Sequence, residues 1–345
     1  MYRNNRRESA DRANLFYRLE EIATGKSADR VGILFEDRSW TYAQMYEAAL
    51  KYGNYFKSKY GLKPRDIVAL DLVNSDHFLL ICFGLWSIGV RPACINYNLT
   101  GDALCHCVKT ANSVLMLADP DIESNVDEGV REKLRGLRIE FLTEVAISTA
   151  MAMDPPMPLY HSSAMIMGFC HCFEAEATFA VGRRFSTRTF WEDVRQHNAT
   201  IIQYVGETCR YLIAAKPHID PTTGEDLDKK HNVRLALGNG LRPDVWEVFQ
   251  ERFGIEAVAE FYSATESFGG TWNLCRNDFS RGAIGRNGWF YDLIMRNKHP
   301  IVARDHETDA PYRDPRTGLC LAVSRGEVGE LLFAFHQRQN YPGRV

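Results

Sequence analysis

Residues 259–270, AEFYSATESFGG, place an aromatic ring, a hydroxyl group and a carboxylate directly after an apolar segment. Tyr262 ends the apolar run, and Ala264, Thr265 and Glu266 follow it. In a nucleotide site, a tyrosine ring can stack on a base, a threonine hydroxyl can donate to a phosphate oxygen, and a glutamate can bind Mg²⁺. A solvated loop explains Thr265 and Glu266 equally well, so this segment alone leaves both interpretations open.

A second segment with this potential is LGNGLRP, residues 237–243. Gly238 and Gly240, on either side of Asn239, lack a Cβ and would let the backbone approach a planar ring. Taken alone, this pattern is more typical of a tight turn between a strand and a helix. Both segments are expected at the carboxyl ends of successive strands, where open α/β sheets bind ligands, and this placement favours a nucleotide site.

The segment PLYHSSA, residues 158–164, is a third polar group, and it precedes an apolar helix. One interpretation is that Ser162 or Ser163 caps this helix. The other interpretation puts His161 at the mouth of a substrate pocket, with the apolar helix behind it suited to an acyl tail. Core packing explains the apolar helix equally well.

Several motifs are discarded as signs of other chemistries. Residues 25–27, GKS, would need a glycine where Glu20 stands to form a phosphate loop, and GNGLRP lacks the third glycine of a dinucleotide fingerprint. No GxSxG segment is present, which disfavours an α/β hydrolase. Residues 281–288, RGAIGRNG, could bind an anion but are more typical of a connection between strands.

The nine cysteines are an odd number in a chain without an apparent secretion signal, so we expect reduced thiols. The triplets at residues 105–107 and 170–172, each Cys-His-Cys, could suggest zinc. Structural zinc ligands usually lie two to four residues apart, and helix positions i and i+2 face apart. We therefore favour buried, inert cysteines over a metal site.

Length and composition indicate an ordinary globular protein. The 345 residues are 45% hydrophobic and 25% charged, which suggests two or three cores. A net charge of −3 gives no field that would attract nucleic acid. The longest apolar run, Phe78–Val90, is shorter than the about 20 residues that cross a bilayer and predicts a buried helix.

The elements that must position the polar segments alternate between strands and helices. We expect strands at residues 31–35, 40–42, 66–72, 92–95, 114–118, 178–181, 200–204, 233–237 and 256–261. We expect helices after a Thr41–Gln44 capping box, at residues 76–88, 100–110, 165–173, 187–197 and 207–215, and from Pro243 to Gly254. This alternation predicts an α/β fold with parallel sheets covered by helices on both faces.

Seven segments together resemble the fatty acid transport protein / very-long-chain acyl-CoA synthetase family of adenylate-forming ligases. They are RSWTYAQ, NYNLTG, PLYHSSA, TIIQYVGETCRYL, GNGLRPDVW, EFYSATE and SRGAIGRNGW. The resemblance implies the large N-terminal domain of such a ligase, with two doubly wound, mainly parallel sheets. It predicts a first α/β subdomain at residues 11–148, a second with the nucleotide motifs at 155–275, and the start of a small β subdomain at 276–345.

The resemblance also implies a reaction: ATP- and Mg²⁺-dependent activation of a long-chain or very-long-chain fatty acid to an acyl-adenylate, then transfer to coenzyme A. Thr265 would contact the α-phosphate, Glu266 would bind Mg²⁺, and His161 would lie by the fatty carboxyl group. The nucleotide site implied by the resemblance comprises Gly238, Asn239, Gly240, Tyr262, Ala264 and Thr265. The family further implies association with membranes of the endoplasmic reticulum, peroxisome, lipid droplet or cell surface.

The chain departs from the family pattern in ways that bear on activity. The family's Ser/Thr/Gly-rich phosphate loop has no counterpart here, because a segment is missing between about Glu144 and Asp154. Position 267 is Ser where the family usually has Gly. From the resemblance we also expect this chain to lack the family's N-terminal anchoring segment and its C-terminal domain with the catalytic lysine. We therefore expect an impaired acyl-CoA synthetase; a non-catalytic relative that binds fatty acids or partners, and an incomplete gene product, are the alternatives.

Overall fold

The structure is a computed structural model that describes residue 12 and residues 14–142, 158–264, 269–286, 300–324 and 326–332. The chain forms two compact units, Met1–Val233 and Arg234–Val345, each of which is described by itself. The subdomain boundaries expected at residues 148–155 and 275 remain predictions.

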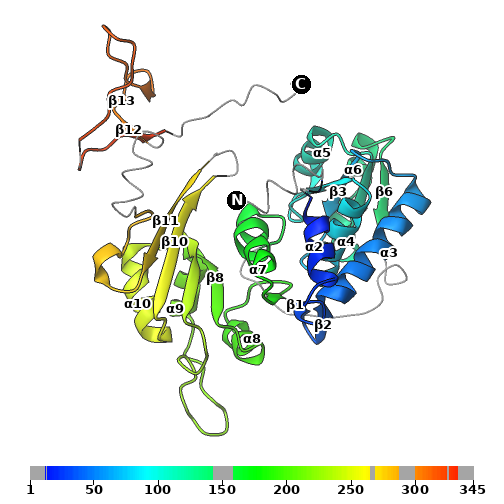
Figure 1. Cartoon of the computed structure of the whole chain (residues 1–345), viewed down its shortest axis with the longest axis horizontal. Helices are drawn as coiled ribbons and strands as arrows, with labels where there is room; N and C mark the ends of the chain where they lie inside the picture. Colours follow the sequence, from blue (N-terminus) through cyan, green and yellow to red (C-terminus); the bar gives the residue numbers. More distant parts are fainter. Residues whose placement is uncertain are drawn as a thin grey trace. The chain divides into compact units, whose positions relative to one another are not determined.

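The first unit contains two sheets and the helices that cover them (Figure 1). Its strands are β1 (Val31–Phe35), β2 (Arg38–Thr41), β3 (Ile67–Asp71), β4 (Arg91–Cys94), β5 (Leu115–Ala118), β6 (Arg138–Phe141), β7 (Phe179–Val181) and β8 (Ile201–Val205). Its helices are α2 (Leu15–Ala23), α3 (Tyr42–Tyr60), α4 (Asp76–Ser87), α5 (Gly101–Thr110), η1 (Pro120–Asn125), α6 (Glu128–Lys133), η2 (Ser163–Cys170), α7 (His171–Glu174), α8 (Phe190–Gln196) and α9 (Gly206–Ala214).

The larger sheet of this unit confirms the predicted parallel α/β arrangement. Its strand order is β4-β3-β5-β6, and all three pairings are parallel. Alternate residues of β3 face two different cores: Val68 and Leu70 face one, and Ala69 faces the other. Strand β6 and the helices α2, η1 and α6 were not predicted from the sequence.

The predicted hairpin of β1 and β2 is confirmed, and it leads directly into α3. The predicted capping box is also present, since the Thr41 hydroxyl accepts from the Gln44 amide and the Gln44 side chain accepts from the Thr41 amide. Helix α3 packs closely on α4 because a Cβ on Gly84 would lie only 2.5 Å from the Cβ of Tyr52. The hairpin, α3 and the N-terminus of α4 thus form one tightly packed group.

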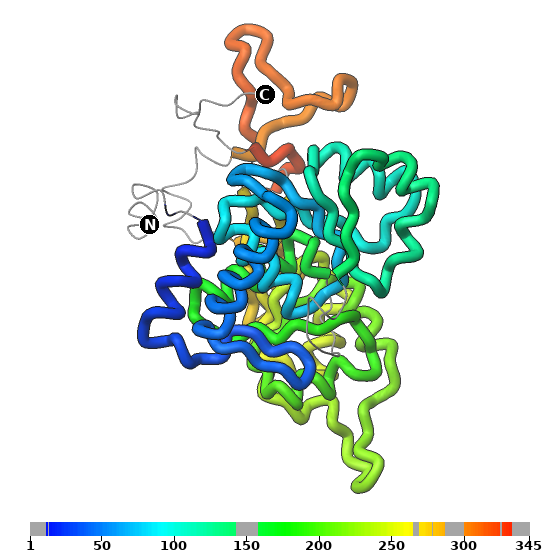
Figure 2. Tube along the Cα trace, turned by 90° about the vertical axis from the view of Figure 1, so that its right-hand side faces the viewer, coloured from blue at the N-terminus to red at the C-terminus, as the bar shows by residue number. Residues whose placement is uncertain are grey.

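Strand β7 pairs in parallel with β1, so residues far apart in sequence share the core of the first unit. Phe169 and Phe173, from η2 and α7, are buried in that core. Residues 216–232, which follow α9, form a long loop that projects from the unit (Figure 2).

The second unit contains β9 (Leu235–Asn239), α10 (Pro243–Phe253), β10 (Ala257–Ser263), β11 (Gly270–Cys275) and η3 (Asp278–Ser280). Helix α10 begins at Pro243 and ends at Gly254, as predicted. Strand β10 pairs in parallel with β9 and antiparallel with β11. The sequence analysis ended the strand at Phe261 and missed β11; the observed strand continues to Ser263 because β11 supplies its hydrogen-bond partners.

Short strands follow in the remainder of this unit: β12 (Ile301–Val302), β13 (Arg304–Asp305), β14 (Ala310–Pro311) and β15 (Glu330–Leu331). Strands β12 and β15 pair, as do β13 and β14, and both pairs are antiparallel. In the described part of the chain, no helix has both the length and the hydropathy needed to cross a membrane.

Asp71, at the end of β3, is fully buried, and neither of its carboxyl oxygens has a hydrogen-bond partner in the described structure. Burial, together with the nearby Asp119, raises the pKa of Asp71 to about 7. Burial also raises the pKa of Glu36 to about 7. A carboxyl whose pKa is raised by folding favours the folded state at low pH, and this stabilisation is lost as the pH rises through the folded-state pKa.

The wild type is expected to lose stability between pH 4 and pH 8, as Asp71 becomes charged in its buried position. We predict that this loss is smaller by about 2–4 kcal/mol in Asp71→Asn, since each pKa unit corresponds to about 1.4 kcal/mol. Urea unfolding followed at several pH values measures this change. Asp29→Asn, at an exposed position, is the matched control and should leave the pH dependence unchanged. Equal pH dependence in wild type and Asp71→Asn would show that Asp71 is not the titrating group.

Candidate nucleotide site

Two of the segments identified from the sequence lie at one edge of the sheet in the second unit. Strands β9 and β10 are parallel, and Gly238 pairs with Glu260. Gly240 and Tyr262 therefore each lie two residues beyond a paired position. Because neighbouring strands are about 5 Å apart, the two segments meet at the carboxyl ends of these strands.

Glu260 fixes the loop that follows β9, and the sequence analysis did not identify it. Its side chain is buried, and its Oε1 accepts a hydrogen bond of 3.0 Å from the backbone amide of Leu241. The bond joins the GNGLRP segment directly to the strand that carries Tyr262. The signal in the sequence was a single carboxylate inside the apolar run of residues 257–262, where a buried charge requires partners.

Gly240 and Asn239 give this edge its shape and its hydrogen-bonding capacity. Gly240 has a φ of 77°, in the left-handed region that side chains with a Cβ rarely adopt. The Oδ1 atom of Asn239 is buried and has no hydrogen-bond partner in the described structure. Buried polar atoms are normally paired, so this oxygen is available to an N–H donor from a ligand.

Tyr262 lies on the exposed side of the same edge, with 52% of the residue accessible to solvent. Side chains alternate along a strand, so Tyr262 and Glu260 point to the same face of the sheet. The ring is thus free to stack on a planar ligand next to the loop that Glu260 holds. Ala264, the residue after β10, is half-buried.

The described residues on either side of positions 265–268 are held together. Ser263 pairs with Gly270 across the hairpin, and the Ser263 hydroxyl donates to the Gly269 carbonyl at 3.4 Å. Thr265 and Glu266, the residues expected to contact phosphate and Mg²⁺, lie outside the described residues together with Ser267. Their roles remain predictions.

His161 belongs to the first unit and acts there as a helix cap. Its Nδ1 accepts from the Ser163 amide at 3.1 Å, at the start of the π-helix η2. Ser162 is the N-cap residue, which agrees with the expectation that Ser162 or Ser163 starts this helix, but its side chain makes no capping bond. The imidazole is exposed, so its Nε2 face remains accessible.

The segment before His161 is fixed by Asn74, which precedes α4. Asn74 is buried, and its Oδ1 accepts from the Leu159 amide at 2.7 Å. Gln203 of β8 donates to the Ser163 carbonyl at 2.8 Å. These two bonds position His161 from both sides.

The alternative anion site around Arg281 is occupied by structural contacts. Arg281 forms an ion pair with Glu247 of α10 at 3.0 Å. The carbonyls of Ser280 and Ala283 accept from the buried Asn273 side chain, so this segment packs along β11.

None of the nine cysteines forms a disulfide bond. Within the described ranges, no group of three or more His, Cys, Asp or Glu side chains could hold a metal ion.

Comparison with known proteins gives a consistent match along most of the chain. A family model described as AMP-binding enzyme matches residues 19–155 and 148–334. Long-chain fatty acid transport protein 2 of Rattus norvegicus is 30% identical over 375 residues, covering 89% of this chain and 58% of the relative. The very long-chain fatty acid transport protein of Saccharomyces cerevisiae is 28% identical, covering 86% and 54%. Isopenicillin N epimerase component 1 of Hapsidospora chrysogena is 33% identical, covering 88% and 54%.

Solved structures show the same fold at low sequence identity. A benzoate CoA ligase from Burkholderia xenovorans LB400 has a TM-score of 0.70 at 15% identity, covering 92% of this chain and 70% of that chain. ATP-bound MatB from Rhodopseudomonas palustris has a TM-score of 0.68 at 18% identity, covering 92% and 69%. The predicted fold, the large domain of an adenylate-forming ligase, is confirmed.

The matches also locate a difference from the relatives. The alignment with the rat protein extends over 375 residues, more than the 345 of this chain, so the relative has internal residues that this chain lacks. The family match is divided into two segments that overlap at residues 148–155, close to the position of the segment expected to be missing. The chain spans a little over half the length of the curated relatives it matches.

We predict that Glu260→Ala lowers the free energy of unfolding by about 1–3 kcal/mol, because the buried Leu241 amide loses its acceptor. Glu260→Gln retains a carbonyl oxygen at this position and should lose less. Urea denaturation of the three proteins gives the comparison. If Glu260→Ala is as stable as the wild type, the carboxylate does not hold this loop.

Proposed function

The chain belongs to the AMP-binding enzyme family, and we propose that the edge formed by β9 and β10 binds the adenosine part of an acyl-adenylate. The observation that carries the proposal is the buried, unpartnered Oδ1 of Asn239. Adenine has an exocyclic amino group that can donate to this oxygen. The exposed ring of Tyr262 supplies a stacking surface beside it.

The proposed substrate is a long-chain or very-long-chain fatty acid. Support comes from the relatives, several of which are fatty acid transport proteins. In the reaction implied by the family, the fatty carboxylate attacks the α-phosphate of ATP and pyrophosphate leaves. The thiol of coenzyme A then attacks the acyl carbon, and AMP leaves.

The remaining roles in this proposal follow the sequence. Thr265 contacts the α-phosphate, and His161 lies by the fatty carboxyl group. Glu266, which lies outside the described residues, would bind the Mg²⁺ that accompanies ATP. Several relatives are named as transport proteins. The same proposal therefore includes association of this chain with an intracellular membrane or the cell surface.

We further propose that this chain binds adenylates but catalyses their formation poorly. Residues 137–167 contain no glycine and residues 134–215 no lysine, in the region where the two segments of the family match overlap. Pyrophosphate departure requires donors that stabilise the charge developing on the phosphates, and losing one such donor typically costs about 10²–10³ in rate. The alternative to a weakly active synthetase is a non-catalytic protein that uses the same site to bind fatty acids or their adenylates.

Replacing Asn239 should separate binding from stability. We predict that Asn239→Ala weakens binding of a non-hydrolysable acyl-adenylate analogue about five- to tenfold, the equivalent of one hydrogen bond. The free protein should be as stable as the wild type or more stable, since an unpaired buried acceptor is removed. Calorimetric titration and thermal melting provide the two readouts.

Asn54→Ala, at an exposed position on α3, is the matched control and should change neither quantity. Tyr262→Ala tests the stacking surface in the same titration and should also weaken the analogue. Unchanged affinity in both Asn239→Ala and Tyr262→Ala would remove the adenosine from this edge.

Catalysis is tested separately, with ATP, Mg²⁺ and a panel of fatty acids. We predict that exchange of labelled pyrophosphate into ATP and formation of acyl-CoA stay near background, although the analogue binds. The reason is the absence of several phosphate donors together. Turnover that is clearly above background and disappears in Glu266→Ala would contradict the proposed impairment.

A further inference from the structure

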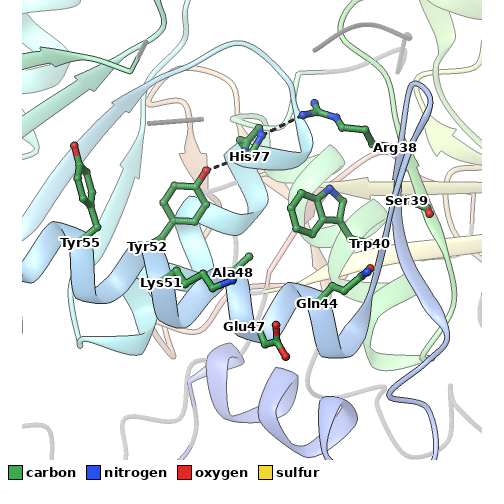
Figure 3. A pocket seen from close by; sticks show the side chains of 10 residues that line it. All are labelled: Arg38, Ser39, Trp40, Gln44, Glu47, Ala48, Lys51, Tyr52, Tyr55 and His77. Atoms are coloured by element: carbon green, nitrogen blue, oxygen red, sulfur yellow. Dashed lines mark hydrogen bonds between the residues drawn. The ribbon is translucent and has the colours of Figure 1, made fainter. Parts of the chain in front are cut away.

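A pocket of about 670 Å³ lies in the first unit, among residues that the proposed function does not use. It is bordered by β2, by one side of α3 and by the N-terminus of α4 (Figure 3). Its volume falls in the range of about 300–1,000 Å³ that is usual for small-molecule sites.

The spacing of residues on α3 creates this hollow. Gln44, Ala48 and Tyr52 follow one another at intervals of four residues and line one side of the pocket. Residues four apart lie on the same face of a helix. Ala48 is the small member of this row, and it lies between the larger rings of Tyr52 and Trp40 (Figure 3). The short side chain leaves room for a ligand between those rings.

An ion pair between half-buried Arg38, which lines the pocket, and buried Asp76 lies beside it. Asp76 is fully buried, and its two carboxyl oxygens accept from Arg38 Nη2 at 2.8 Å and from Trp40 Nε1 at 2.6 Å. The charge of Arg38 is thus balanced by Asp76, and the indole N–H of Trp40 is already paired. Because the two charges neutralise each other, a ligand in the pocket does not need to supply a counter-ion for either of them.

His77 connects this pair to Tyr52. Its Nε2 lies 3.2 Å from Arg38 Nη1, and its Nδ1 lies 2.7 Å from the Tyr52 hydroxyl (Figure 3). Arginine can only donate, so Nε2 is the acceptor, and the ring proton is on Nδ1. The tautomer is inferred from this hydrogen-bond pattern.

Tyr52 therefore accepts a hydrogen bond from His77 and keeps its own proton for another acceptor. Burial raises the pKa of Tyr52 and lowers the pKa of His77, so the phenol stays protonated and the imidazole stays neutral at pH 7. Tyr52 lines the pocket, and its neutral hydroxyl retains one proton for a further acceptor.

Lys51 supplies a positive charge to the same pocket. Its side chain is exposed and lines the pocket, and among the described residues it makes no ion pair. Glu47 lies four residues earlier on α3, but its carboxylate points away from the two rings (Figure 3). One unbalanced cation and one neutral donor match a ligand with a single negative charge.

We propose that this pocket binds a small organic carboxylate, with its apolar body over Ala48 and between the rings of Trp40 and Tyr52. The carboxylate accepts from the Tyr52 hydroxyl and from the Lys51 ammonium group. A cationic ligand is disfavoured by Lys51. A phosphate monoester, with close to two negative charges, exceeds the one available cation.

The test uses 2-naphthoate as the probe and the full chain as the protein, followed by calorimetric titration. We expect saturable binding of 2-naphthoate, and weaker binding of the uncharged 2-naphthamide, which has nearly the same shape. Lys51→Met should weaken 2-naphthoate about fivefold, as for a partly exposed ion pair. Tyr52→Phe should weaken it by about tenfold or more, because a hydrogen bond to a charged group is lost.

Ala48→Leu fills the space between the rings and should abolish binding. Lys57→Met, an exposed lysine of α3 that does not line the pocket, is the matched control and should bind like the wild type. Asn239→Ala should also bind 2-naphthoate normally, which separates this pocket from the adenosine edge. Thermal melting verifies that each variant is folded.

The proposal is overturned if 2-naphthoate does not bind at millimolar concentration. It is equally overturned if Lys51→Met and Lys57→Met bind it alike, or if 2-naphthamide binds as tightly. Lys51 is exposed, so its replacement does not endanger the fold, and the comparison of the two lysine variants remains decisive even if Ala48→Leu is unstable.

Discussion

The parallel register of β9 against β10 is the constraint on which the candidate nucleotide site depends. Gly238 pairs with Glu260, and both strands therefore end at the same edge of the sheet. The bond from the Leu241 amide to Glu260 then holds the loop after β9 against β10. A shift of one residue would turn Glu260 and Tyr262 to the other face, because side chains alternate along a strand. The relative positions of Asn239 and Tyr262 follow from this one pairing.

The same edge combines rigidity with an unsatisfied acceptor. Strand β11 extends the support on the other side of β10, and Ser263 and Gly270 close the base of the loop that carries Thr265 and Glu266. Asn239 Oδ1 remains buried and unpaired within this frame. An unpaired buried acceptor typically costs about 1–3 kcal/mol. Such a cost is typical of sites whose missing partner is a ligand, and it supports the proposal that this edge binds one.

Much of the fold could be predicted because the signals are local. The Thr41–Gln44 capping box and the start and end of α10 at Pro243 and Gly254 depend on neighbours in sequence. Periodicity did not reveal strand β11, the bond from the Ser163 amide to His161, or the pocket over Ala48. The pocket depends on packing between β2, α3 and α4. Residue types and the expected strand ends singled out the two candidate segments, and the resemblance to a family assigned predicted roles to their residues. Only the structure showed that the Glu260 side chain accepts a hydrogen bond from the Leu241 amide and so joins the GNGLRP segment to the strand that carries Tyr262.

The central claim is that an adenylate binds at the edge formed by β9 and β10 in this chain. Hydrogen–deuterium exchange with and without an acyl-adenylate analogue tests it most directly, since exchange reports ligand contacts along the whole backbone. We expect slower exchange in residues 238–242 and 257–264, with residues 44–55 unaffected. Unchanged exchange in both of the first two segments at saturating analogue would contradict it.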